Sequence, residues 1–152
     1  MGFPGGARAG RADRWRRRGD AMWPRALEVW LLLLAVAFAN GAFRVAVLIP
    51  RLGQYPAHIL STLSLSVFIV LLARFTIGWM LIDSARRALL VGSLWLACTL
   101  AFEFLAGHYL FGSPWEKLLA EYQVLHGRIW VLVLIATFAA PLWAFSQGRP
   151  ER

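Results

Sequence analysis

Charged side chains interrupt three long apolar stretches of this chain. Arg44, Arg74 and Glu103 each stand in a run of residues that is otherwise uncharged. A charge inside a membrane-spanning helix costs about 2.5 to 3.5 kcal/mol on insertion scales, so such a residue indicates a pairing partner or a functional site. Arg44 and Glu103 have opposite signs, and the topology predicted below places both in the same half of a bilayer. They could form a salt bridge, or they could bind a proton or a small solute.

Polar and small residues share helical faces with these two charges. Asn40 lies one turn before Arg44, Thr99 lies one turn before Glu103, and His108 follows near the end of the same stretch. Side chains spaced by four lie on one side of a helix, and small residues between them let two helices approach closely. The sequence therefore predicts an intramembrane polar cluster of Asn40, Arg44, Thr99, Glu103 and His108. Both a salt bridge between two helices and a solute or proton site fit this pattern.

The remaining ionisable residues give weaker signals. Arg74 stands near the end of its stretch, where a long side chain reaches the lipid headgroups. His58, His108 and His126 come near one predicted surface and would suit a metal or a haem, but the HxxxH and HExxH spacings do not occur. The GxSxG, P-loop and GxGxxG motifs are absent from the sequence as well. We therefore predict no catalytic residue, no metal ligand and no bound cofactor.

Composition indicates a membrane protein. Hydrophobic residues make up 59% of the 152 residues, charged residues make up 16%, and the mean hydropathy is +0.59. A soluble domain normally has about 25% charged residues. The net charge is +8, but seven of the sixteen basic residues precede Ala26 and flank the first apolar stretch. This arrangement favours membrane orientation over nucleic-acid binding. The single cysteine, Cys98, excludes an internal disulfide.

Four apolar stretches predict four membrane-spanning helices, because about 20 apolar residues are needed to cross the hydrocarbon core. The expected spans are residues 26–49, which end at Pro50, and residues 57–82, 88–111 and 129–145. Together they form a transmembrane domain of residues 26–146. Residues 1–25 should be a disordered basic tail and residues 147–152 a second, short tail. The expected fold class is an all-α membrane protein, a four-transmembrane-helix bundle.

The loop between the third and fourth spans has a helix signal of its own. Ser113 and Glu116 have the spacing of a capping box. Apolar residues then recur every three or four positions, which predicts a short amphipathic helix over residues 114–125. It should lie flat in the outer interface of the bilayer. If this helix docks a partner, Trp115 and Tyr122 are the expected anchors, since aromatic residues dominate interface energies.

The beginning of the chain allows three interpretations. Met22 could be the true start, because the preceding segment resembles a translated leader. The small residues around Ala37 and Ala39, after a basic segment and an apolar run, also resemble a signal-peptide cleavage site. Apolar character resumes after Gly41 and continues to Ile49. We therefore expect the first span to remain as an anchor.

Basic residues set the predicted orientation, since short cytoplasmic flanks carry the excess of Lys and Arg. The N-terminal tail has seven of them, and the same side also receives Arg86, Arg87, Arg149 and Arg152. The opposite loops contain Arg51, Lys117 and Arg128. Both termini should therefore be cytoplasmic. The ratio of fifteen Arg to one Lys suggests a GC-rich bacterial genome, and hence a bacterial cytoplasmic (inner) membrane.

Several short strings of the sequence resemble a group of small four-span bacterial inner-membrane proteins of unassigned function. They are residues 40–44, 102–109, 113–119 and 127–130. The resemblance covers most of the chain after Met22. The resemblance implies a four-span topology and does not indicate an activity.

Three functions from different classes fit these observations. The first is a non-enzymatic accessory or interaction protein, whose partners are the lipid bilayer and either another membrane protein or further copies of this chain. The second is an oligomeric transporter for a small solute, an ion or protons that uses Glu103 and Arg44. It must be oligomeric because four helices fill their own centre with side chains. The third is a membrane metal or haem enzyme subunit.

Overall fold

The computed structural model describes residues 5–110, 112, 114–116 and 130–148. Over these residues the chain is helical and contains no strand, which confirms the all-α class. The elements are α1 (Gly5–Phe43), the π-helical turn η1 (Arg44–Leu48), α2 (Ile49–Leu52), α3 (Gln54–Thr76), α4 (Ala85–Leu105), the π-helical turn η2 (Ala106–Leu110) and α6 (Val131–Gln147). Tyr122 and most of the expected helix over residues 114–125 lie outside the described residues.

Three helices are long and apolar enough to cross a membrane. They are Gly19–Leu52, which continues from α1 through η1 and α2, Gln54–Thr76 and Ala85–Leu105, with mean hydropathies of 2.1, 2.0 and 1.9 in their most apolar windows. The fourth apolar helix, α6, is shorter, with 17 residues. Large apolar side chains are exposed on the outer faces of these helices, and Phe75 is 79% exposed. Such faces suit a lipid environment.

The first helix is longer at both ends than the sequence predicts. It begins at Gly5, so residues 5–25 are helical where we expected a disordered tail. Ala and Arg have high helix propensities, and extending a helix that already exists needs no new nucleus. Pro50 does not end the helix either, because it occupies the first turn of α2, where a proline is tolerated. The chain turns at Gly53, whose φ is +82°.

The connection between α3 and α4 also differs from the expected bounds. Helix α3 ends at Thr76 rather than at residue 82, and Leu81 has a φ of +59°. Helix α4 then begins after Ser84, whose hydroxyl accepts a hydrogen bond from the Arg87 backbone N–H at 3.3 Å. This N-cap satisfies one of the amide groups that a helix start leaves unpaired.

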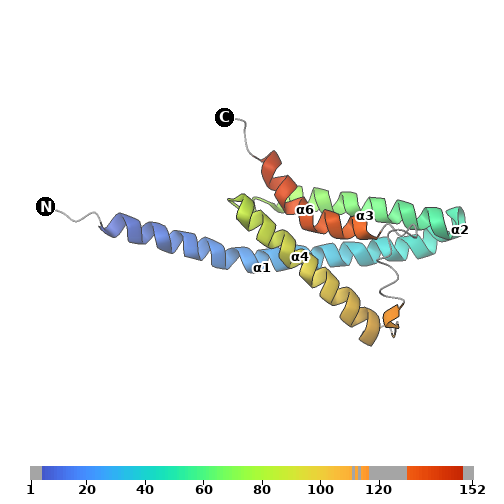
Figure 1. Cartoon of the computed structure of the whole chain (residues 1–152). Coiled ribbons are helices and arrows are strands. Elements are labelled where there is room, and N and C mark those ends of the chain that lie inside the picture. Colours follow the sequence, from blue (N-terminus) through green and yellow to red (C-terminus); the bar gives the residue numbers. More distant parts are fainter. Residues whose placement is uncertain (1–4, 111, 113, 117–129, 149–152) are drawn as a thin grey trace.

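Helix α6 packs against both α3 and α4, and α1 packs against α3 and crosses α4 (Figure 1). Figure 1 also shows two departures from a closed bundle: the N-terminal part of α1 extends beyond the other helices, and the C-terminal end of α4 points away from the ends of α1 and α3. The helices are therefore packed together at one end of α4 and diverge at the other.

A glycine lets α4 approach α6 closely. A Cβ added at Gly92 of α4 would overlap the carbonyl oxygen of Phe138 in α6 and lie 3.1 Å from its carbonyl carbon. One turn later, Trp95 is completely buried, and its Nε1–H donates a hydrogen bond to the Ala26 carbonyl oxygen at 2.8 Å. Close approach at a glycine is a usual way for helices to pack in membranes.

Arg25 joins α1 to the connection between α3 and α4. Arg25 donates a hydrogen bond to the Trp79 carbonyl oxygen at 2.7 Å and lies 5.3 Å from the centre of the Trp79 ring. Arg87 forms a salt bridge with Asp83 at 2.8 Å. The middle of α1, around Arg25, therefore lies beside the connection between α3 and α4.

Candidate functional site

A polar cavity of about 120 Å³ lies between α1 and α3. Its lining combines polar side chains with small and apolar ones: Ala37, Asn40, Gly41, Arg44, Ser61, Thr62, Leu65 and Trp130. Most of these residues come from one face of α1 and one face of α3, and Trp130 precedes α6.

The sequence of α1 makes room for this cavity. Ala37 and Gly41 share a helical face with Asn40 and Arg44, because each of the four lies three or four residues from two of the others. Their side chains are too small to fill the space beside the longer polar groups. Arg44 is also the first residue of the π-helical turn η1, and π-helical turns frequently occur at functional sites.

Hydrogen bonds across the cavity join α1 to α3. The Asn40 side-chain amide donates to the Ser61 carbonyl oxygen at 3.0 Å, and the Arg44 guanidinium lies 3.0 Å from the His58 Nδ1. A guanidinium can only donate, so the His58 Nδ1 is the acceptor in this contact. The Ser61 hydroxyl is occupied within α3, where it donates to the His58 carbonyl oxygen at 3.1 Å.

The expected salt bridge between Arg44 and Glu103 is not formed. Among the residues that the structure describes, Arg44 makes no ion pair, and its polar contact is His58. The physical reason is the direction of the helices. Asn40 and Arg44 face α3, whereas α4 points away from the end of α1 beyond their crossing (Figure 1).

The other members of the expected polar cluster are also separated from Arg44. The Thr99 hydroxyl accepts a hydrogen bond from Trp30 Nε1 at 3.1 Å, and His108 stacks on an aromatic ring in the next part of the chain. The structure thus brings Asn40 and Arg44 together, but it does not join them to Thr99, Glu103 and His108. It adds His58, Ser61 and Thr62 from α3, which a partner of opposite charge for Arg44 did not predict. The sequence feature that could have predicted them is the Ser- and Thr-rich start of the second span, since this span runs antiparallel to the first.

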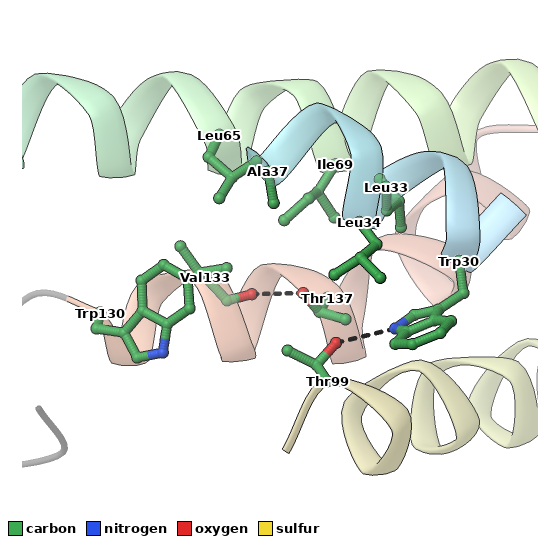
Figure 2. A pocket seen from close by; sticks show the side chains of 10 residues that line it. All are labelled: Trp30, Leu33, Leu34, Ala37, Leu65, Ile69, Thr99, Trp130, Val133 and Thr137. Carbon is green, nitrogen blue, oxygen red and sulfur yellow. Dashed lines mark hydrogen bonds between the residues drawn. The ribbon is translucent and has the colours of Figure 1, made fainter. Parts of the chain in front are cut away.

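An apolar cavity of about 40 Å³ adjoins the polar one (Figure 2). Ala37, Leu65 and Trp130 line both cavities. The two hydroxyls that Figure 2 shows are already bonded: Thr99 accepts from Trp30, and Thr137 donates to the Val133 carbonyl oxygen at 2.7 Å. The polar cavity is therefore bordered on this side by apolar side chains.

A second cluster, the aromatic cluster of Phe104, His108, Tyr109 and Trp115, lies at the C-terminal end of α4. Trp115 stacks on His108 with ring centres 4.1 Å apart and on Phe104 at 6.3 Å. His108 meets Tyr109 edge to face at 4.9 Å. Trp115, an expected docking anchor, thus contacts its own chain and is still 42% exposed.

The chain matches no protein-family model, no curated protein and no solved structure. The chemistry of the two sites therefore has to be argued from their geometry. Within the described ranges, no three His, Cys, Asp or Glu side chains are grouped closely enough to hold a metal ion. The polar cavity presents a cation and hydrogen-bond donors, and the aromatic cluster presents an ordered apolar surface.

Proposed function

We propose that this chain is a non-enzymatic accessory protein of a bacterial cytoplasmic membrane, which crosses the bilayer four times and binds a membrane-protein partner at its outer end. Three long apolar helices support residence in a membrane. The proposed fourth span is α6, whose 17 residues extend about 25 Å at 1.5 Å per residue. This length is at the short end of the range for a membrane-spanning helix.

The observation that carries the proposal is the aromatic cluster at the diverging end of α4. Its rings are already stacked on one another, while Tyr109 is 75% exposed. Rings that are ordered before binding lose little conformational freedom when a partner covers them. Exposed aromatic residues also supply the largest share of the binding energy in many interfaces.

The distribution of basic residues supports an outward-facing cluster. Arg25 and Arg87 lie at the opposite end of the bundle from the aromatic cluster, beside the connection between α3 and α4. Because cytoplasmic flanks carry the excess of positive charge, this end and both termini are assigned to the cytoplasm. The aromatic cluster is then on the outer side.

Site-specific photocrosslinking in native membranes tests the proposal. A photoreactive residue at position 109 or 115 should form adducts with one protein species, whereas the same residue at position 67, where Val67 is exposed on a proposed lipid face, should give lipid adducts. The complex should also disappear from native gels in Trp115→Ala and persist in Trp115→Phe, which keeps an aromatic ring. Lipid adducts alone at positions 109 and 115, with an unchanged complex in Trp115→Ala, would reject the proposal.

A second candidate, transport of a small solute by an oligomer, is favoured by the polar cavity beside Arg44. Glu103 does not line this cavity, so the candidate now depends on Arg44. Solute flux into proteoliposomes that is lost in Arg44→Gln, with oligomer size unchanged, would support it. Equal flux in both proteins would exclude it.

A further inference from the structure

The half-buried guanidinium of Arg44 lies in a setting that favours an anion. It lines the cavity between α1 and α3, and in the described part of the chain it makes no ion pair. Its polar contact there is the His58 ring nitrogen Nδ1 at 3.0 Å, which supplies no negative charge. The positive charge of Arg44 is therefore not compensated by these contacts. A negative group in the cavity would compensate it.

Thr62 supplies a second, independent observation. Its side chain is only 2% exposed and lines the same cavity. Its backbone carbonyl accepts a bond from Ser66, but its hydroxyl makes no hydrogen bond within the residues that the structure describes. In the described residues no enclosed side-chain nitrogen or oxygen lacks a hydrogen-bond partner, so the Thr62 hydroxyl is open to the cavity beside Arg44. It can donate a hydrogen bond to a group bound there.

The N–H donors of Arg44 and Asn40 and the volume of the cavity limit the kinds of ligand that the cavity can bind. Arg44 has five N–H groups, so several are left after the bond to His58, and Asn40 has a second amide hydrogen beyond the one given to Ser61. A cavity of about 120 Å³ is larger than the volume of about 10 to 15 Å³ that one water needs on the same measure. The site therefore has room for a group with several acceptor oxygens. Guanidinium groups recognise such oxyanions, phosphate above all, through paired N–H donors.

We propose that this cavity binds a phosphate group, held by the Arg44 guanidinium and the Thr62 hydroxyl. The group belongs either to free inorganic phosphate or to the headgroup of an anionic lipid. The apolar walls formed by Ala37, Leu65 and Trp130 strengthen the attraction, because they keep the local dielectric constant low. The proposal is independent of the docking role of the aromatic cluster, and either can fail alone.

The test uses the full chain purified in an uncharged detergent. One arm measures the thermal unfolding midpoint against increasing inorganic phosphate, and the other measures retained phosphatidylglycerol by native mass spectrometry, with phosphatidylcholine as the comparison lipid. Arg44→Gln removes the charge and Thr62→Val removes the hydroxyl. Arg74→Gln is the matched control, because Arg74 is an exposed arginine that does not line the cavity.

We expect Arg44→Gln to weaken binding by about tenfold or more, since charge-assisted hydrogen bonds are the strong ones. Thr62→Val should weaken it by about threefold or more, and Arg74→Gln should bind as the unaltered chain does. Binding in the phosphate arm identifies the free ion, and binding confined to phosphatidylglycerol identifies the lipid headgroup. Each supports the proposal.

Two results would overturn it: no binding of either probe by the unaltered chain, or equal binding by Arg44→Gln and Arg74→Gln. If Arg44→Gln does not fold, Thr62→Val decides instead. Unchanged affinity in that variant would refute the site, and a loss of about threefold or more would support it.

Discussion

The described helices pack differently at the two ends of α4. At the end that holds Gly92 and Trp95, α4 touches α6 with backbone against backbone, and a completely buried indole fastens it to Ala26. At the other end, polar, small and apolar side chains together line a cavity of about 120 Å³, and α4 points away from the other helices (Figure 1). The first arrangement has little room for a ligand. The second has the open space and the exposed rings that binding requires.

The residues expected to stabilise the fold and the residues expected to bind a ligand lie at different ends of the packed helices. Close contacts between small residues supply the packing that holds helices together in lipid, where lipid tails are as apolar as the helices. Atoms that line a cavity have no such contacts on the side that faces it. We therefore expect substitutions at the Gly92 end to affect stability, and substitutions around Arg44 to affect binding more than stability.

The largest stability loss should come from Trp95→Ala. Removing a buried aromatic side chain costs about 3 to 5 kcal/mol, and this variant also loses the hydrogen bond to Ala26. Trp95→Phe keeps an aromatic ring but loses the hydrogen bond. Its smaller loss of stability therefore measures what the indole N–H contributes. Unfolding in detergent, followed by circular dichroism, gives both values. If Trp95→Ala were no less stable than Trp143→Ala, a substitution at an exposed tryptophan, the tight end would not be the stabilising one.

Gly92→Ala should have the next largest effect. The new Cβ would overlap the Phe138 carbonyl oxygen, and overpacking of this kind costs about 1 to 3 kcal/mol. The control is Gly41→Ala, because a Cβ at Gly41 meets nothing within 4 Å and alanine favours helix. The difference between the two unfolding midpoints is the measurement. Equal midpoints would show that α4 and α6 do not approach closely at Gly92.

The smallest effect should come from Asn40→Ala, at the open end. It removes the hydrogen bond from Asn40 to Ser61, and hydrogen bonds between membrane helices contribute about 0.6 kcal/mol on average. Ser64→Ala is the control, since its hydroxyl bonds within its own helix, to the Leu60 carbonyl oxygen. A loss in Asn40→Ala as large as that of Gly92→Ala would remove the distinction between the two ends.

Local properties of the sequence determined the helices. The apolar stretches predict α3, α4 and α6 with bounds that differ from the observed ones by two to six residues, because the length of an apolar run is a local quantity. The errors are local too. The Ala- and Arg-rich segment before Ala26 extends α1, and Pro50 fits into the first turn of α2. Both depend on whether a neighbouring helix can continue, which composition alone does not show.

Tertiary structure decided which side chains meet. The sequence supplied Asn40 and Arg44 on one helical face, but opposite charge suggested Glu103 as the partner, and the structure places His58 there. Apolar residues surround the membrane helices on nearly all sides, so no apolar stripe marks the face that packs. Asn40 of α1 bonds to Ser61 of α3, and Gly92 of α4 packs against Phe138 of α6. These contacts join residues far apart in the chain, and for that reason the partner of Arg44 was decided by the tertiary structure and not by the sequence around it.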